Sequence, residues 1–301
     1  PYESAESRRF GFELLVSDIL AASPDIVIVN ELNPLPSQAR ELADRLGFSM
    51  VHDVDHAGWR IGPVGLPANL RSGTAILARP DLGLELVDRE RLGAPTVGPV
   101  VAAHARRSPG ILLARVSLAS GPLSVSTVHY PASPIPVDEV LTAGARAYLQ
   151  TREDADGFVR DLRDAVEGEQ QRLQMVRRTV DFLNDRSADA PVILAGTFNF
   201  LASSPEAELL RSAGFADLAV THGRGDLRTY LPSANGAISA QLERERGLGG
   251  SAAVAGDRRI DFIMARGNRL SGITTARVAD VPTFSVYPSD HFGLFARIRA
   301  R

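Results

Sequence analysis

The chain carries the sequence PVILAGTFNF at residues 191–200, an apolar run followed by Gly196, Thr197 and Asn199. A short continuous apolar run is typical of a strand that is covered on both faces. Glycine and asparagine are typical of the turn that follows such a strand. We therefore predict that Thr197 and Asn199 lie at the carboxyl end of a buried strand, at the mouth of a site.

Similar apolar runs recur along the chain and are bounded by turn residues, and we predict a strand for each. They cover residues 25–29, 74–77, 84–87, 110–116, 123–128, 192–195, 259–264 and 294–298. Strands and helices mix without a strict strand-helix-strand rhythm. The pattern favours an α/β (α+β) fold of two packed mixed sheets flanked by helices over a doubly wound parallel sheet.

Two helices are predicted from apolar stripes, and packing against the core explains both. Phe10, Leu14, Ile19 and Leu20 indicate a helix before the first strand. The second stripe consists of Leu173, Val176, Val180 and Leu183.

We expect one domain over residues 1–301, with insertions at 137–169 and 221–257. The first insertion is charged and predicted to be helical, with Val159, Leu162 and Val166 on one face; the second is rich in Gly, Ser and Ala. Long additions of this kind are commonly functional, and we expect at least one of them to border a substrate cleft.

Composition narrows the class of protein. The formal net charge is −3, which argues against strong bulk binding of nucleic acid, although a local basic groove stays open. Every basic residue is an arginine, so each can contact a phosphate through a planar fork. The chain contains no cysteine, which excludes disulfides and thiolate metal sites and leaves the compartment, cytoplasmic or secreted, open. There is no apolar run of membrane-spanning length and no visible signal peptide, and we expect a monomer.

Three polar residues follow predicted strands and are candidates for phosphate chemistry. Glu31 follows the apolar run 25–29, where a carboxylate can hold Mg²⁺. His129 ends the run 123–128 and can donate to a phosphate oxygen. Asn199 can donate to a phosphate and orient a water molecule. Taken singly, the default explanations are an exposed loop glutamate, a loop histidine and a turn asparagine.

The strongest local signal is Ser289-Asp290-His291. His291 suits acid–base work and needs a carboxylate that fixes its tautomer. Asp261 interrupts an otherwise apolar strand, and since a buried carboxylate needs a partner, we predict that it pairs with His291. Asp290 is a candidate metal ligand. A helix N-cap or a turn remains the alternative explanation of the Ser-Asp-His triplet.

These pieces occur in one order along the chain: NE at 30–31, RSGTAILAR at 71–79, VHY at 128–130, GTFN at 196–199, RRIDFI at 258–263 and SDHFG at 289–293. Together they resemble the endonuclease/exonuclease/phosphatase superfamily, which has the deoxyribonuclease I-like fold. The resemblance implies a four-layer α/β sandwich and a phosphoesterase that uses Mg²⁺, with Mn²⁺ as an alternative. The substrates it implies include nucleic acids, phospholipid headgroups and small phosphodiesters.

The resemblance also implies roles for individual residues. Glu31 would bind the metal, with Asp290 assisting it or the water. His129 and Asn199 would contact the scissile phosphate, and Asp261 would orient His291 for in-line attack of water on phosphorus. Candidate substrate contacts are Arg71, Tyr130 and Arg258.

One departure affects the expected activity. The family's central motif reads Gly-Asp-x-Asn, and here Thr197 stands at the position of its aspartate. A threonine hydroxyl cannot accept a proton usefully near pH 7 and brings no negative charge to a metal. Two hypotheses follow: an active metal-dependent phosphoesterase that uses another base, and a catalytically silent protein that binds a phosphorylated ligand.

Overall fold

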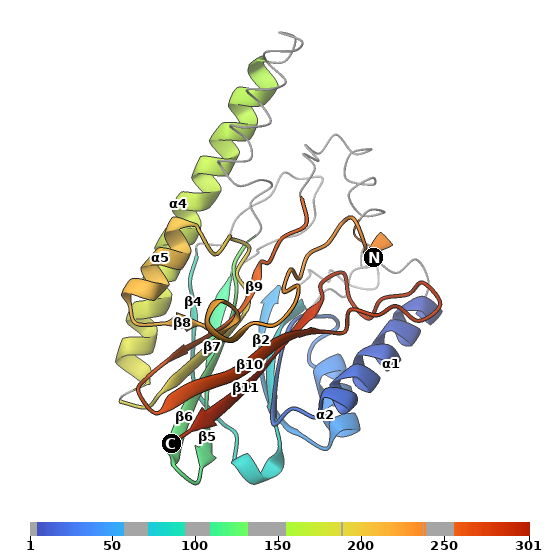
Figure 1. Cartoon of the computed structure of the whole chain (residues 1–301), viewed down its shortest axis with the longest axis vertical. Coiled ribbons are helices and arrows are strands. Elements are labelled where there is room, and N and C mark those ends of the chain that lie inside the picture. The colour runs from blue at the N-terminus through green and yellow to red at the C-terminus, as the bar shows by residue number, and fades with distance from the viewer. Residues whose placement is uncertain are drawn as a thin grey trace, which may run out of the picture.

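The computed structural model of the chain describes residues 5–56, 72–93, 109–131, 155–187, 189–236, 238 and 256–301 (Figure 1). Its helices in these ranges are α1 (Ala5–Ala22), α2 (Ser37–Leu46), α4 (Ala155–Arg186), α5 (Pro205–Ser212) and α6 (Leu218–His222), with a short 3-10 helix η1 (Pro80–Leu82). No helix in these ranges combines the length and the apolar character needed to cross a bilayer.

The described strands form three sheets. The largest has six strands in the order β4-β5-β6-β7-β9-β8, with β6 and β7 parallel and the other neighbours antiparallel. Its strands are β4 (Glu85–Arg91), β5 (Gly110–Leu118), β6 (Gly121–His129), β7 (Val192–Thr197), β8 (Ala216–Asp217) and β9 (Asp261–Arg266). The second sheet has the order β1-β3-β2 and the third is the pair β10-β11. Their strands are β1 (Ile26–Leu32), β2 (Ser49–His56), β3 (Ser72–Ala78), β10 (Leu270–Val278) and β11 (Gly293–Ala300).

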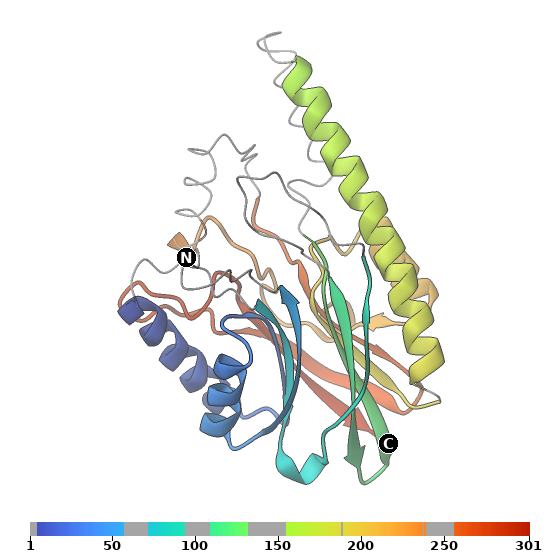
Figure 2. The same cartoon turned by 180° about the vertical axis from the view of Figure 1, so that it is seen from behind.

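The elements stack in four layers, because the six-stranded and the three-stranded sheets each pack on helices with one face and on each other with the opposite face. In β5, Ile111 and Leu113 face a core shared with α4 and α5, whereas Leu112 and Ala114 face the opposing sheet. A third core lies between the three-stranded sheet and the helices α1 and α2. Figures 1 and 2 show α4 along one outer side and the α1–α2 pair along the other. The predicted fold class of two packed mixed sheets flanked by helices is confirmed.

The first predicted helix exists, but its predicted stripe is partly wrong. In α1 the large apolar side chains that are buried are Phe12 and Val16, and Leu20 is 55% exposed. Phe12, Val16 and Ile19 pack on the same core as Ala39 and Leu42 of α2. The stripe that covers the sheet therefore begins two residues later than the sequence pattern indicated.

The predicted helix over 137–169 and the stripe at 173–183 belong in part to one element. The helix α4 runs without interruption from Ala155 to Arg186, and residues 137–154 lie outside the described part of the chain. Within α4, Val176 and Leu183 are fully buried, while Val159 is 52% exposed and Val166 is also exposed. The face proposed for the first turns is thus on the surface.

Every predicted strand overlaps an observed one, while β2, β8 and β10 were not predicted. The strand β9 begins only at Asp261, so Arg259 and Ile260 precede it. Of the second proposed insertion, residues 221–236, 238 and 256–257 are described, and Tyr230 forms an isolated bridge with Arg258.

Candidate active site

Three predicted site residues lie in one row across neighbouring strands. In the sheet register, His129 at the end of β6 is opposite Thr197 at the end of β7, and Thr197 is opposite Asp261 at the start of β9. The parallel pairing of β6 and β7 brings two carboxyl ends to the same edge, and β9 arrives from the opposite direction. The row places residues that are far apart in sequence within reach of one substrate.

Asn30 holds this row to the second sheet. Its side-chain oxygen accepts from the backbone N–H of Thr197 at 3.0 Å, and its nitrogen donates to the Thr127 hydroxyl at 3.2 Å. The pairing of β1 with β3 shifts register between Val29 and Leu32, and Glu31 takes a positive φ of 59°. A bulge of this kind re-aims side chains at the end of a strand, and a strained non-glycine residue is typical of functional sites.

Gly196 makes the close approach of the strands possible. Its φ is +143°, and a Cβ placed there would lie 2.1 Å from the carbonyl oxygen of Val128 and 2.9 Å from Oδ1 of Asn30. No side chain fits this contact unless β6 or β7 moves.

We expect Gly196→Ala to lower the free energy of unfolding by about 3 kcal/mol or more, because backbone strain and a backbone clash add. The matched control is Gly47→Ala, where φ is also positive, +68°, but nothing lies within 4 Å of the added Cβ. That control should cost about 1 kcal/mol. Urea unfolding of both variants measures the difference, and equal costs would contradict the close packing of Gly196.

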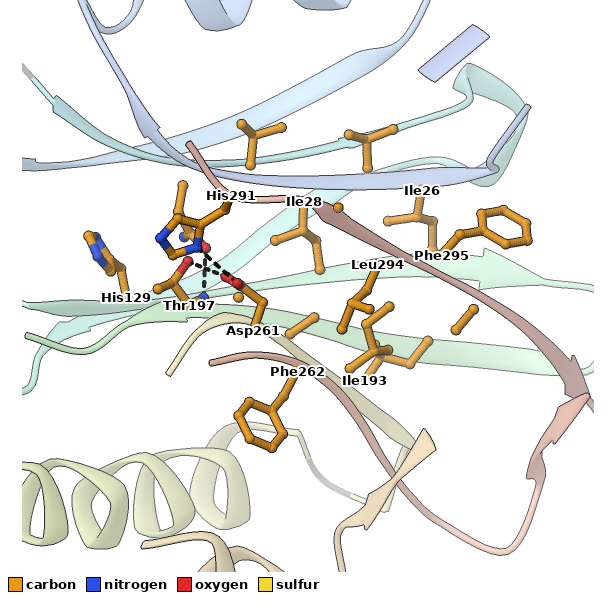
Figure 3. A pocket seen from close by; sticks show the side chains of 18 of the residues that line it. Ile26, Ile28, His129, Ile193, Thr197, Asp261, Phe262, His291, Leu294 and Phe295 are labelled. Carbon is orange, nitrogen blue, oxygen red and sulfur yellow. Dashed lines mark hydrogen bonds and ion pairs between the residues drawn. The ribbon is translucent and has the colours of Figure 1, made fainter. Parts of the chain in front are cut away.

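The centre of the row is a hydrogen-bonded chain of side chains (Figure 3). The Thr197 hydroxyl donates to Oδ1 of Asp261 at 2.7 Å, and Nδ1 of His291 lies 2.9 Å from Oδ2. Burial raises the pKa of Asp261, but the charge of His291 and hydrogen bonds from His291, Thr229 and Thr197 outweigh it and leave that pKa below its ordinary value. Asp261 is therefore an ionised acceptor.

His291 is the positive end of this chain. Burial lowers its pKa, whereas the charge and hydrogen bond of Asp261, with smaller contributions from Asp290 and Glu31, raise it to about 9. The ring of Tyr230 contacts the imidazole edge-on, with 5.4 Å between centroids. The imidazole is therefore protonated at neutral pH and is suited to donating a proton or stabilising negative charge.

The predicted metal ligands lie beside this chain. Glu31 is 65% exposed, and its Oε1 lies 3.6 Å from Nε2 of His129. The Asp290 carboxylate accepts from the Ser289 hydroxyl at 3.2 Å. No group of three or more His, Asp or Glu residues that could hold a metal ion occurs within the described ranges. Mg²⁺ commonly takes only one or two protein carboxylates and fills its shell with water and phosphate oxygens, so this donor set fits that ion.

Asn199 and Tyr130 contact each other through one hydrogen bond. Asn199 has a positive φ of 55°, and its amide nitrogen donates to the carbonyl oxygen of Tyr130 at 2.8 Å. The side chain of Tyr130 is fully buried, donates to the Thr179 hydroxyl at 2.8 Å and packs on Phe198 and Phe200. A ring in that position cannot stack on a substrate, so the predicted contact of Tyr130 does not fit the structure.

The predicted arginine contacts divide into two cases. The guanidinium of Arg258 lies 5.6 Å from the centre of the Tyr230 ring, at the rim of the site. Arg71 lies outside the described residues.

A cavity of about 1370 Å³ joins these groups. Figure 3 shows Thr197, Asp261 and His291 at its polar end, and the residues that line the cavity include every predicted site residue of the described chain, Tyr130 among them. Its polar lining includes Glu31, His129, Thr197, Asn199, Tyr230, Arg258, Asp261, Asp290 and His291.

Sequence reasoning assigned no role to three residues that support the site. Asn30 and Thr127 fix the ends of β1, β6 and β7, and Thr229 accepts from the backbone N–H of Asp261 at 3.3 Å. Asn30 directly precedes Glu31, and Thr127 lies two residues before His129. This proximity to predicted site residues could have indicated a supporting role for both. Thr229 lies in a segment without apolar periodicity, and nothing in the local sequence distinguishes it.

Comparisons with solved structures agree with this architecture. The chain is similar to an endonuclease/exonuclease/phosphatase from Bacteroides vulgatus, with a TM-score of 0.63, 16% identity and coverage of 97% of this chain and 91% of the other. It is similar to D. rerio TDP2 in complex with a single-strand DNA product, with a TM-score of 0.59, 18% identity and coverage of 96% and 92%. It is also similar to the human Nocturnin catalytic domain with bound sulfate, with a TM-score of 0.56, 16% identity and coverage of 99% and 88%.

At these identities the solved structures show the fold alone. No curated protein sequence matches the chain significantly. The model of the Endonuclease/Exonuclease/phosphatase family, by contrast, matches residues 3–291. With the fold, the motif order and this match in agreement, the chain belongs to the Endonuclease/Exonuclease/phosphatase family.

Proposed function

We propose that the chain is a Mg²⁺-dependent phosphoester hydrolase that acts on phosphodiesters by in-line attack of water. The observation that supports it best is the chain Thr197–Asp261–His291, which presents a protonated imidazole to the cavity beside His129 and Asn199. A phosphodiester carries negative charge that grows on its non-bridging oxygens as water attacks. Positive groups and fixed donors aimed at those oxygens lower the barrier.

Each residue has a distinct part in this proposal. His291 stabilises the developing charge and is held in place by Asp261, while His129 contacts a non-bridging oxygen. Asn199 has one amide N–H on the Tyr130 carbonyl, which fixes the side chain and leaves its second N–H for phosphate or water. Water forms the new P–O bond, the bond to the leaving oxygen breaks, and the enzyme forms no covalent intermediate.

Glu31 would hold the magnesium ion, with Asp290 as the second candidate. When bound, the ion would neutralise charge on the phosphate and lower the pKa of a coordinated water. The strained backbone of Glu31 and its exposed carboxylate support this assignment.

The site lacks an evident group that could accept a proton from the attacking water at neutral pH. Thr197 already donates its hydroxyl proton to Asp261 and has no useful basicity. His291 is protonated below pH 9 and accepts a proton only at higher pH. If His291 acts as the base, the rate rises as pH increases through about 9.

This shortage of a base favours a second candidate function, a catalytically silent protein that binds a phosphorylated ligand. Such a protein keeps the cationic His291 and the donors Asn199 and His129 but turns nothing over. Inorganic phosphate or a phosphodiester should then raise the melting temperature without release of product. If no phosphorylated compound shifts the melting temperature, this candidate fails.

We expect Glu31→Gln to reduce Mg²⁺-dependent hydrolysis of bis(p-nitrophenyl) phosphate by roughly 10²-fold, since Mg²⁺ takes only one or two protein carboxylates and one of them is lost. The control is Glu85→Gln, which removes an exposed glutamate at the start of β4. The assay compares rates across a Mg²⁺ titration and after chelation. A rate that is unchanged by chelation would contradict metal dependence in the parent chain.

A further inference from the structure

The main chain of His291 is held differently from that of the residues around it. His129, Thr197 and Asp261 lie at strand ends, where the ladders of the six-stranded sheet fix the backbone. His291 lies in a loop, two residues before β11 begins at Gly293. Its backbone therefore needs other contacts to keep the imidazole aimed at Asp261.

Two of these contacts are made within the loop. The backbone N–H of His291 donates to the Ser289 hydroxyl at 3.1 Å, and that hydroxyl lies 3.2 Å from Oδ1 of Asp290. These bonds shape the turn, but they move with the loop. A contact from another segment is required to fix the loop relative to the strand β9, which carries Asp261.

The segment 229–235 supplies contacts of this second kind. The backbone N–H of Phe292 donates to the carbonyl oxygen of Thr229 at 2.8 Å. The hydroxyl oxygen of the same threonine accepts from the backbone N–H of Asp261 at 3.3 Å. Thr229 thus joins the residue that follows His291 to the residue that pairs with its imidazole.

Asn235, in the same segment, holds the two residues before His291. It is fully buried, and its amide nitrogen donates to the carbonyl oxygen of Ser289 at 2.9 Å and to that of Asp290 at 3.3 Å. Because both partners are acceptors, the NH₂ group of the amide must face them. One amide offers two N–H donors for these two carbonyls, whereas a hydroxyl offers one donor and an aliphatic side chain none.

The Asn235 side chain stands on a fixed backbone and away from the cavity. Its backbone N–H donates to the carbonyl oxygen of Leu231 at 2.9 Å, and its carbonyl oxygen accepts from the N–H of Ile238 at 3.1 Å. Both of these neighbours are buried apolar residues. Asp290 and His291 line the cavity and Asn235 does not, so its amide can act on a bound substrate only through the loop.

We propose that Asn235 is a positioning residue for His291: its amide fixes the main chain of Ser289 and Asp290 and thereby keeps the imidazole aimed at Asp261 and the cavity. A functional side chain is held precisely when buried hydrogen bonds of this kind lock the residues that carry it. The consequence for the rate rests on the function proposed above, whereas the consequence for the geometry of His291 does not.

The test is Asn235→Ala in the full chain, with Asn235→Ser as the milder variant if the alanine variant does not fold. The matched control is Thr275→Val, which also removes a buried hydrogen bond from a side chain to a main-chain carbonyl, that of Leu218 at 3.0 Å. Thr275 lies in β10 and does not line the cavity.

Three properties are measured for each protein. They are the melting temperature, kcat and KM for bis(p-nitrophenyl) phosphate with saturating Mg²⁺, and the downfield proton NMR signal of the His291 Nδ1–H. The absence of that signal from His291→Gln assigns it. The signal reports the hydrogen bond to Asp261 and does not require turnover.

We expect both Asn235→Ala and Thr275→Val to lower the melting temperature, because each leaves a buried carbonyl without its donor. Only Asn235→Ala should also lower kcat, by roughly 10²-fold, since a displacement of about 1 Å near the chemistry can cost that much. KM should stay unchanged, because His129 and Asn199 still contact the phosphate. The His291 signal should shift or disappear in this variant alone.

The proposal is overturned if Asn235→Ala behaves as Thr275→Val does, losing stability while it keeps the parent's kcat and the parent's His291 signal. A parent chain without turnover would contradict the proposed reaction. The His291 signal would then still decide the role of Asn235, so the two failures are distinguishable.

Discussion

Replacing Thr197 with aspartate is expected to raise Mg²⁺-dependent phosphodiester hydrolysis by roughly 10²-fold or more, the usual contribution of a positioned general base. The position is suited to that role because Thr197 ends β7 in the same row as His129 and Asp261, at the polar end of the cavity. A carboxylate there can accept a proton from the attacking water and add negative charge for the metal. The measurement is the hydrolysis rate of bis(p-nitrophenyl) phosphate with saturating Mg²⁺.

The same substitution has a predictable cost without metal. The Thr197 hydroxyl lies 2.7 Å from Oδ1 of Asp261, so Asp at position 197 brings two carboxylates together. Like charges at that distance oppose joint ionisation. The metal-free variant should therefore melt below the parent, and Mg²⁺ should stabilise the variant more than it stabilises the parent.

Thr197→Asn is the matched control, since it has the size of aspartate but no charge or basicity. It should show neither the gain in rate nor the additional stabilisation by Mg²⁺. Equal, metal-dependent rates in the parent and the aspartate variant would show that this chain uses another base. No turnover by either protein, together with stabilisation of the parent by phosphate, would favour the silent binding protein.

The fold could be predicted from the sequence where its apolar pattern is regular. Runs such as 110–116 and 123–128 became β5 and β6 because these strands bury both faces and need continuous apolar side chains. The strand β2 was missed because its buried positions include Asp53 and Asp55, which pair with Arg91 at 3.0 and 3.2 Å. Because these ion pairs to β4 bury charged side chains, β2 lacks the apolar residues at buried positions by which a strand is predicted from sequence.

Only those residues of the candidate site that stand in recognisable sequence motifs could be predicted. The pairing of Asp261 with His291 followed from a charged residue in an apolar strand, and the structure brings these two side chains together. The burial of the Tyr130 ring could not be predicted from its place after His129. It depends on Thr179 of α4, whose hydroxyl oxygen accepts a hydrogen bond from the Tyr130 hydroxyl, and on the phenylalanines that flank Asn199.

Replacing His291 with alanine is expected to lower both activity and stability, with a pH dependence that identifies the ion pair. Removing one partner of a buried pair leaves the other charge uncompensated, at a cost of 3–5 kcal/mol when burial is complete. His291 and Asp261 keep 24% and 17% of their side-chain surface exposed, so we expect about 3 kcal/mol, at the low end of that range. Residual hydrolysis should fall by roughly 10²-fold because charge stabilisation is lost.

The sign of the pH dependence follows from the two pKa shifts. The pKa of His291 is raised from 6.5 to about 9, so its contribution is fully present below pH 6.5 and is lost as pH rises through about 9. The pKa of Asp261 is lowered from 3.8, so its contribution is lost as pH falls below that value. The difference in unfolding free energy between the parent and His291→Ala should therefore be largest between about pH 4 and pH 7.

His52→Gln is a control whose effect on stability should depend on pH in the opposite direction. Burial lowers the pKa of His52 from 6.5, so the stability that this residue contributes is lost as pH falls, and its variant should differ from the parent least in acid. Asp261→Asn, alone and combined with His291→Ala, completes a double-mutant cycle. A coupling energy near zero, or a His291→Ala deficit that persists undiminished above pH 10, would contradict an ionised pair. A coupling that disappears with the deprotonation of His291 would show that the imidazolium facing the cavity is held by Asp261, as the proposed charge stabilisation requires.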